Sequence, residues 1–394
     1  MECQSHLFSL PSDEHYLNCA YKGPLPRATE EAGIVGLRRK STPARMQPSD
    51  FFSEPDALRQ SIGGLINAPA EKVALVPAVS YGTALAALNV KLGAGDNVVM
   101  PGEEFPSNVY AWRENARRAG AELRMPPRPD ERLFPARVWS ERMLAAIDSR
   151  TRVVALSTVH WTDGTPFDLA PLRKRAADVG ALFMLDGTQS IGAVPFDWEA
   201  LNPDLLVCAG YKWLLGAYQL GFAVIGEALA DWQPLEHNWI GREGSEDFTS
   251  LTRYRDGFAP GARRFDVGER SNPVSLPMLA ESIRQIGQWG VENIAGYTEK
   301  LRELLRAELE ETFGPCPPED PPRGPWMYPG HQLSPHLFGV NLPAGQDPVR
   351  VAEELRRMKV HVSVRGSSVR VSPHVYNDQG NISALAAALR RACG

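Results

Sequence analysis

A carboxylate and an ammonium group follow two neighbouring apolar runs in the middle of the chain. Asp186 comes directly after the run at residues 181–185, and Lys212 comes shortly after the run at residues 205–209. Both runs are apolar throughout and are followed by polar and glycine residues, which is typical of buried parallel strands. The carboxyl ends of such strands lie along one edge of the sheet, where open α/β proteins bind ligands. We therefore expect Asp186 and Lys212 to face one site.

A lysine and an aspartate in such a site supply two complementary chemical functions. A lysine amine forms a Schiff base with a carbonyl compound, and a carboxylate stabilises a protonated ring nitrogen. Pyridoxal 5'-phosphate (PLP) requires both groups. The structural alternative is an aspartate that caps the next helix beside a solvated lysine, but the pairing of the two groups at adjacent strand ends favours a cofactor site.

The residues around both groups carry a resemblance to a known family. The stretches DGTQSIG, from residue 186, and GYKWLLG, from residue 210, resemble the class V branch of the PLP-dependent aminotransferase superfamily, which includes kynureninases, cysteine desulfurases and isopenicillin N epimerases. The resemblance extends over nearly the whole chain. It implies that Lys212 holds PLP, that Asp186 pairs with the pyridine nitrogen and that Gln189 hydrogen-bonds the ring hydroxyl. Tyr211 resembles a tyrosine that contacts the phosphate in kynureninases.

Further positions resemble cofactor contacts of the family. The run PAVSYGTALAAL, from residue 77, predicts a turn that opens a helix, and free N–H groups at a helix N-terminus form an anion site. The resemblance places Val79 and Ser80 there, on the cofactor phosphate. It places Phe105, after a strand expected at residues 97–100, on the face of the pyridine ring, where stacking contributes about 1 kcal/mol beyond burial.

A loop-rich segment at residues 231–275 resembles the one by which a subunit of this family reaches its partner's active site. Within it, Trp239 and Asn272 match kynureninase positions that contact phosphate and substrate. The resemblance therefore implies a homodimer with shared active sites.

The substrate site is expected near the carboxyl terminus, in the run VRVSPHVYN. Arg370 is central to a predicted strand of valines and serines, and its planar guanidinium can bind a carboxylate through two hydrogen bonds. The pattern R-x-S-x-x-x-Y-N resembles the class V motif whose arginine binds the amino-acid carboxylate. Asn18 and Tyr21 on an entry segment, and Asn108 at a position that is aspartate in kynureninases, are further substrate candidates. A structural role is preferred for Arg365, His374, Tyr376 and His160, and Lys22 has no assignment.

The reaction implied is one on a small amino acid through an external aldimine and a Cα carbanion, with Lys212 removing the Cα proton. Cysteine desulfurases carry a nucleophilic cysteine on a loop before the matching arginine, whereas this chain has none between Cys316 and Cys393. That difference favours a cysteine-independent β-lyase. An aminotransferase, an epimerase and a kynureninase-type hydrolase remain open, and the substrate is not identified.

A non-catalytic PLP-fold scaffold is the alternative from another class of protein. The joint presence of Lys212, Asp186, Gln189 and Arg370 favours an enzyme. A nicotinamide-dependent dehydrogenase would need a G-x-G-x-x-G run after the first strand, and the chain has none there.

The length and the alternation of elements predict the architecture. A chain of 394 residues exceeds one hydrophobic core, and from a helix expected at residues 56–66 onwards helices and strands alternate, which predicts an α/β fold. The resemblance implies PLP-dependent transferase fold type I. We expect an N-terminal segment at 1–50 that contributes to the active-site mouth and the small domain, a large domain with a mostly parallel seven-stranded sheet at 51–275, and a small α+β domain within 276–394 after a linking helix at 276–314.

Composition excludes several other classes. The net charge is −5 and there are no basic runs, which argues against nucleic-acid and anionic-membrane partners. Five scattered cysteines without C-x-x-C spacing predict neither a metal site nor a disulfide framework. The N-terminus lacks a signal-peptide pattern, and the uncharged run at 73–90 is interrupted by Pro77 and Gly82. We expect a cytoplasmic enzyme.

Overall fold

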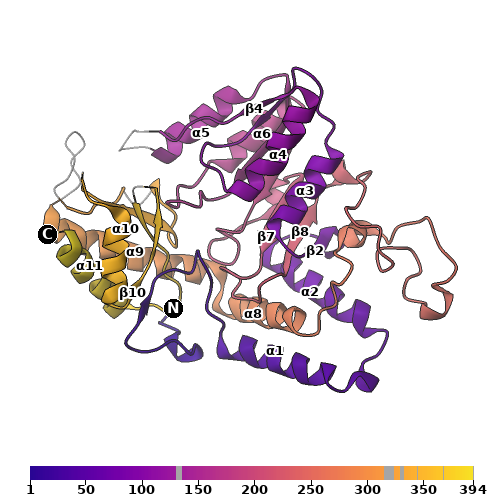
Figure 1. The fold of residues 1–394 in the computed structure, drawn as a ribbon, viewed down its shortest axis with the longest axis horizontal. Helices are drawn as coiled ribbons and strands as arrows, with labels where there is room; N and C mark the ends of the chain where they lie inside the picture. Colours follow the sequence, from indigo (N-terminus) through magenta and orange to yellow (C-terminus); the bar gives the residue numbers. More distant parts are fainter. Residues whose placement is uncertain (130–134, 315–323, 329–331, 344, 367, 394) are drawn as a thin grey trace.

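A seven-stranded sheet forms the centre of the larger part of the molecule (Figure 1). The computed structural model describes residues 1–129, 135–314, 324–328, 332–343, 345–366 and 368–393. The strand order is β2-β8-β7-β6-β5-β3-β4, and only β8 runs antiparallel to its neighbours. The strands are β2 (Val73–Val76), β3 (Asn97–Val99), β4 (Glu122–Arg124), β5 (Thr151–Ser157), β6 (Leu182–Asp186), β7 (Leu205–Ala209) and β8 (Gly221–Ile225). The predicted α/β fold with a mostly parallel sheet is confirmed.

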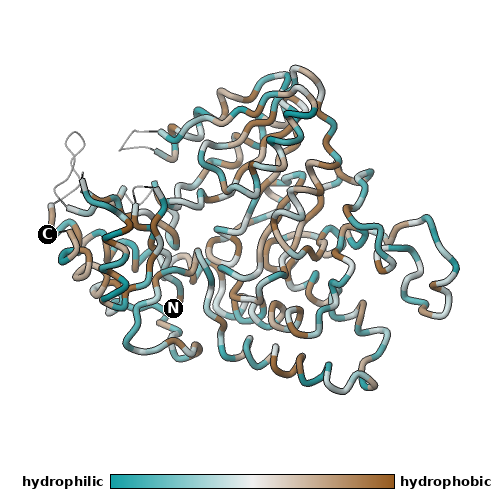
Figure 2. Tube along the Cα trace, in the orientation of Figure 1, coloured by the Kyte–Doolittle hydropathy of each residue, from teal (hydrophilic) through white to brown (hydrophobic). Residues whose placement is uncertain are grey.

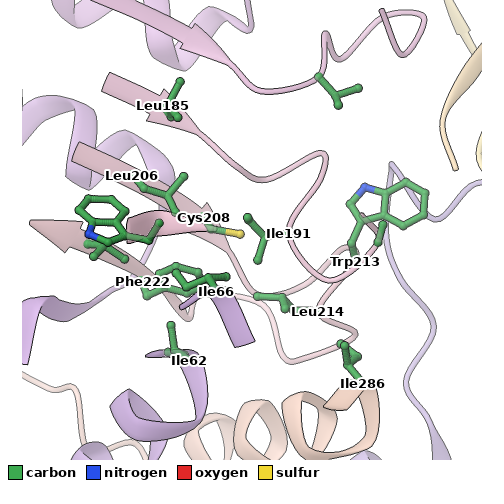
Figure 3. Packing of buried hydrophobic residues seen from close by; sticks show 14 of the residues in the cluster. Ile62, Ile66, Leu185, Ile191, Leu206, Cys208, Trp213, Leu214, Phe222 and Ile286 are labelled. Carbon is green, nitrogen blue, oxygen red and sulfur yellow. The ribbon is translucent and has the colours of Figure 1, made fainter. Parts of the chain in front are cut away.

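Helices cover both faces of this sheet. They are α2 (Asp50–Ile66), α3 (Val79–Asn89), α4 (Pro106–Ala119), α5 (Pro135–Ala146), α6 (Leu169–Asp178), α7 (Trp198–Leu201) and α8 (Ser275–Trp289). Because successive strand residues point to opposite faces, Leu185 and Leu206 pack toward α2 and α8, while Met184 and Val207 pack toward α3 and α4. Figure 3 shows the first of these layers, in which Ile62, Ile66 and Ile286 approach the sheet. Burial on both faces explains why the central strands are apolar throughout.

A smaller α+β unit lies beside the large sheet (Figure 1). Its antiparallel sheet has the order β11-β12-β9, formed by β11 (Ser363–Arg365), β12 (Ser368–Val371) and β9 (Phe338–Asn341). It packs with the helices α9 (Val291–Phe313), α10 (Pro348–Arg357) and α11 (Gln379–Cys393). Val369 and Val371 enter this unit's core, so Ser368 and Arg370 point to the opposite face.

The N-terminal segment joins the smaller unit. Strand β1 (His15–Tyr16) pairs in parallel with β10 (Val360–His361), and α1 (Arg27–Lys40) then packs along α8. The expected contribution of the N-terminal segment to the small domain and to the active-site mouth stays a prediction. The domain boundaries at residues 50 and 275 stay a prediction.

Two expected helix boundaries are wrong. The linking helix at 276–314 is two helices, α8 and α9, separated by Gly290, whose φ of +79° a helix cannot contain. Helix α2 begins at Asp50 rather than at residue 56 and carries Pro55 inside it. The Asp50 carboxylate accepts the N–H of Gln47 (2.9 Å), which fixes the turn that starts the helix.

No helix within the described ranges is long and apolar enough to cross a membrane.

Candidate active site

A cavity of about 360 Å³ opens at the carboxyl ends of β5, β6 and β7. Its wall includes both groups that the sequence singled out. The lining residues are Pro77, Ala78, Val79, Ser80, Phe105, Ser107, Ser157, Trp161, Asp186, Thr188, Gln189, Ala209, Tyr211, Lys212, Tyr218, Gln219 and Leu220. A larger hollow of about 760 Å³ lies between α2 and the α8–α9 junction, but no lysine lines it and no strand ends there. The smaller cavity is therefore the candidate active site.

Asp186 ends β6 and is buried on the side of the sheet that α3 and α4 cover. One carboxylate oxygen accepts the backbone N–H of Thr188 (2.9 Å), and the other accepts the side-chain amide of Asn108 (2.9 Å). These two donors fix the orientation of the carboxylate. Each oxygen keeps a further acceptor position, which a protonated ring nitrogen could fill.

Asn108 lies behind Asp186 and is not among the residues that line the cavity. Its carbonyl oxygen accepts the hydroxyl of Thr83 (3.3 Å), while its amide donates to Asp186. The side chain of Asn108 is directed to Asp186 rather than into the cavity, and its predicted contact with substrate stays a prediction.

Glu104 completes this buried network and was missed by the sequence analysis. Its carboxylate accepts the backbone N–H and the hydroxyl of Ser157 (2.8 and 2.6 Å) and the backbone N–H of Phe105 (2.6 Å). Burial raises the pKa of Glu104, the negative charge of Asp186 adds to that shift, and the hydrogen bonds from Ser157 oppose it. The run GEEFP gives no sequence signal for this role, because the partner Ser157 is distant in the chain.

Lys212 is buried in an aromatic environment. Its ammonium nitrogen lies 5.7 Å from the ring centres of both Phe105 and Tyr211. Burial lowers the pKa of Lys212 to about 8, and the negative charge of Asp186 opposes this shift. A lowered pKa increases the fraction of neutral amine near neutral pH, as a nucleophile or a base requires.

The N-terminal segment passes directly beside the lysine. The N–H of Gly23 donates to the carbonyl of Tyr211 (3.0 Å), and a Cβ at Gly23 would lie 2.1 Å from the carbonyl oxygen of Lys212. Only glycine allows this close approach. Asn18 is buried and accepts the hydroxyl of Ser363 (2.7 Å), whereas Tyr21 is exposed. Neither Asn18 nor Tyr21 lines the cavity, so their contact with substrate stays a prediction.

The first turn of α3 forms another part of the wall. Val79 and Ser80 line the cavity, and their predicted contact with the phosphate stays a prediction. The residue before them, Ala78, is extended and caps the helix with no side-chain hydrogen bond. The N–H groups of this first turn can therefore receive an anion. Together with the buried Asp186 and Lys212, this arrangement fits PLP: the site offers a phosphate position, a partner for the ring nitrogen and an amine.

Phe105 and Trp161 pack against each other at the wall of the cavity. Phe105 lines the cavity, and its ring meets that of Trp161 edge to face with centres 5.4 Å apart. The indole N–H of Trp161 donates to the carbonyl of Glu103 (2.7 Å), which fixes the indole. The position of Phe105 beside Lys212 suits the predicted ring-stacking role, which stays a prediction.

Gln189 and Tyr211 also line the cavity. The Gln189 side chain donates to the carbonyl of Ala20 (3.3 Å) and accepts the indole N–H of Trp213 (3.0 Å). The ring of Tyr211 packs against Tyr218 with centres 4.6 Å apart, and burial raises the pKa of Tyr211 to about 12. The sequence analysis missed the lining residues Ser107, Thr188 and Tyr218, of which Thr188 lies within the DGTQSIG stretch.

Trp239 and Asn272 lie away from the cavity of their own chain. Trp239 is partly exposed and packs with Phe248 (ring centres 5.5 Å apart). Both residues belong to the loop-rich segment at residues 231–275, whose projecting part Figure 2 colours largely hydrophilic. The Asn272 carbonyl oxygen accepts the N–H groups of Val274 and Ser275 (2.9 and 3.0 Å) at the start of α8. Their predicted contacts require a second subunit and stay a prediction.

Arg370, on β12 of the smaller unit, approaches the cavity but is not among the residues that line it. It is buried and donates to the carbonyl of Trp161 (2.7 Å), while its Nε and Nη2 atoms have no hydrogen-bond partner among the described residues. Burial lowers the pKa of Arg370 to about 9, and the positive charge of Arg365 adds to that shift. A buried guanidinium with free N–H groups is suited to a carboxylate ligand.

Two histidines with an expected structural role are fully buried. His160 packs against Trp139 with ring centres 4.7 Å apart, and burial lowers its pKa to about 4. His374 stacks with Trp213, and burial lowers its pKa to about 3. Within the described residues, no cluster of His, Cys, Asp and Glu side chains could hold a metal ion.

Comparison with known proteins shows relatives that span most of the chain. The family model described as "Aminotransferase class-V" matches residues 48–385. Isopenicillin N epimerase of Streptomyces clavuligerus is 28% identical over 95% of this chain and 93% of its own length. Cysteine desulfurase of Escherichia coli (strain K12 / DH10B) is 29% identical over 64% of this chain and 61% of its own length.

Solved structures share the fold. The apo structure of a cysteine desulfurase from Thermococcus onnurineus NA1 superposes with a TM-score of 0.82 at 20% identity, covering 100% of this chain and 98% of that chain. The complex of the cystine C–S lyase C-DES with cysteine persulfide gives a TM-score of 0.84 at 19% identity, covering 96% of this chain and 97% of that chain.

Proposed function

The chain belongs to the class V aminotransferase family, whose members are PLP-dependent enzymes, and we propose that it binds PLP at Lys212 and acts on a small α-amino acid. The observation that carries this proposal is the joint placement of Asp186, Lys212 and the first turn of α3 around one cavity. When bound, PLP supplies an electron sink for the negative charge that develops at the substrate Cα.

The protein's own residues divide the remaining tasks. Lys212 Nζ, neutral in part because burial lowers its pKa, takes the Cα proton. Asp186, held by Asn108 and Thr188, keeps a proton on the ring nitrogen. Arg370 binds the α-carboxylate and so orients the Cα–H bond. Gln189 and Tyr211 take the ring hydroxyl and the phosphate, respectively.

We propose a cysteine-independent β-lyase as the reaction. Support comes from the absence of any cysteine between Cys316 and Cys393, because a persulfide-forming desulfurase needs a nucleophilic thiol before the arginine. The epimerase relative, matched over 95% of this chain, favours epimerisation as the second candidate. In that reaction Lys212 or a second group returns the proton to Cα.

Product analysis separates the two candidates. The PLP-loaded protein is incubated with a panel of L-amino acids in D₂O, and pyruvate, keto acids and the Cα–deuterated D- and L-forms are quantified. A β-lyase releases pyruvate or alanine, whereas an epimerase releases only deuterated D- and L-substrate. If no amino acid of the panel reacts while PLP is bound, that result contradicts the proposed enzymatic function.

We also propose a homodimer in a reducing compartment such as the cytoplasm. The loop-rich segment at residues 231–275 carries exposed apolar residues, including Phe248, Leu251 and Tyr254, which a second subunit could cover. Cys19 and Cys208 are buried free thiols, as is usual for proteins of reducing compartments.

A further inference from the structure

A second guanidinium stands beside Arg370 on the same face of the small sheet. In the β11–β12 pair Ser363 lies opposite Arg370 and Arg365 lies opposite Ser368. Arg365 and Arg370 are therefore diagonal neighbours on one face, with Cβ atoms roughly 7–8 Å apart. Val369 and Val371, which alternate with Arg370, face the core of the smaller unit, so the face that carries both arginines points away from it.

That face is turned toward the large domain and the cavity wall. A Cβ at Gly339, opposite Arg370, would lie 3.1 Å from the Cβ of Asp163. The Arg365 guanidinium lies over the ring of Trp161 at 5.4 Å, and Arg370 donates to the carbonyl of the same residue. Both arginines thus contact Trp161, which lines the cavity, although neither arginine lines the cavity itself.

Neither arginine has a carboxylate partner within ion-pair distance among the described residues. The nearby acids Glu103 and Asp163 are engaged by Arg128 instead. Arg365 donates only to the neighbouring carbonyl of Val364 (2.6 Å), and its buried Nε has no partner. A buried or half-buried guanidinium without a counter-charge is costly, and an anionic ligand would relieve that cost.

The surroundings add further positive charge. Burial lowers the pKa of Lys212, and the positive charges of Arg370 and Arg365 add to that shift. Lys22, on the entry segment, lies 5.3 Å from the ring centre of Tyr218, a lining residue. Asp186 is the sole carboxylate among the described lining residues. The α-carboxylate of an amino acid would satisfy one arginine and leave the second without a partner.

Building on the proposed PLP-dependent function, we propose that the substrate is an amino acid with an anionic side chain, a carboxylate or a sulfinate, and that Arg365 binds this group while Arg370 binds the α-carboxylate. Arginine suits this task because its fork of donors matches both oxyanions. Arg365 is then a specificity-determining residue, and the site selects a substrate with two negative charges.

Binding of unreactive acids tests the second anion site without any turnover. Succinate and butyrate have the same number of carbons and no amine, so they cannot react with PLP. Isothermal calorimetry on the PLP-loaded protein is expected to show succinate binding at least about tenfold more tightly than butyrate. Arg365→Gln should remove this preference, and Arg356→Gln, at an exposed position on α10, should retain it. Equal binding of the two acids by the wild-type protein overturns the proposal.

Turnover tests the same site with substrates. Exchange of the Cα proton in D₂O is the readout, because every amino acid that binds productively can undergo it. For L-aspartate, L-glutamate and L-cysteine sulfinate, Arg365→Gln should lower the kcat/KM of exchange by about 10- to 100-fold, while that of L-alanine should change by less than about threefold. The preferred acid among the three distinguishes carboxylate from sulfinate. An equal loss for alanine means that Arg365 serves the α-carboxylate or the fold, and it overturns the proposal.

Two controls separate the possible failures. Arg365→Lys keeps the charge and should retain part of the succinate preference, which a loss of folding would not allow. If no amino acid reacts but succinate is still preferred in an Arg365-dependent way, the anion site stands and the proposed reaction fails.

Discussion

Lys212 owes its expected reactivity to burial among aromatic rings. Phe105 and Tyr211 are its near neighbours, and Asp186 is the carboxylate whose charge acts on it most strongly. Desolvation disfavours the ammonium form, whereas Asp186 favours it. Because desolvation is the larger effect, the amine loses its proton at a pH below that of a solvated lysine.

This balance predicts a pH dependence for cofactor uptake. Only the neutral amine attacks PLP, so the rate at which the apoprotein takes up PLP should rise with pH and level off above about 8. Absorbance of the bound cofactor after mixing measures the rate. A rate that keeps rising beyond pH 10 would show that Lys212 titrates as a solvated lysine and would contradict the buried environment.

Removal of the Glu104 carboxylate should weaken the buried hydrogen-bond network that also includes Asp186. Glu104→Gln replaces an acceptor oxygen by an NH₂ group amid the donors of Phe105 and Ser157, so the free energy of unfolding should fall by about 1–3 kcal/mol. Denaturant titration of the PLP-loaded protein measures this change. Glu114→Gln, on the exposed side of α4, is the matched control and should leave stability close to that of the wild-type protein. Equal effects of the two variants would remove Glu104 from the network.

At the scale of the elements, the strands were predictable and several junctions were not. Apolar runs such as 205–209 predict buried strands, because the sheet is covered on both faces. Strand β7 spans the residues predicted in this way. The break at Gly290 was missed because the amphipathic pattern continues across it, although its positive φ ends α8. The buried contacts of Glu104 could not be predicted, because they depend on how α4 and β5 are placed against each other.

Gly23 allows the N-terminal entry segment to pass in close contact with the backbone of Lys212. A methyl group at Gly23 would lie 2.1 Å from the Lys212 carbonyl oxygen, so Gly23→Ala should displace the segment. We expect a loss of about 1–3 kcal/mol in the free energy of unfolding and weaker PLP binding, measured by denaturant titration and by absorbance. The control is Gly64→Ala in α2, where no atom lies within 4 Å of the added Cβ. If Gly23→Ala behaves like Gly64→Ala, the segment does not constrain the site.

At the scale of the whole molecule, the site draws on three regions of the chain. The large sheet supplies Asp186 and Lys212, the N-terminal segment supplies Gly23, and the smaller unit supplies Arg370. Trp239 and Asn272 complete this set only if a second subunit brings them to the cavity. Both residues belong to the loop-rich segment at residues 231–275, part of which projects from the molecule in Figure 1.

Mixed dimers test this sharing of sites. Asn272→Asp keeps an acceptor for the turn before α8 but places a negative charge toward the partner's phosphate, and it should be inactive. Mixed with inactive Lys212→Ala, it should restore about a quarter of wild-type activity, because about half of the dimers are hybrids with one intact site of two. A mixture of Lys212→Ala with Asp186→Ala should restore none, since both residues lie on one chain's cavity. No recovery in the first mixture despite demonstrated subunit exchange would mean that each subunit is self-sufficient.

The central claim, that Lys212 holds PLP in the cavity beside Asp186, is tested most directly by covalent labelling. Borohydride reduction of the PLP-loaded wild-type protein fixes the cofactor to the amine that holds it, and peptide mapping by mass spectrometry identifies that residue. We predict the label on Lys212 and, in Lys212→Ala protein, no stoichiometric label at all. Stoichiometric label on another lysine, such as Lys22 or Lys91, would contradict the claim.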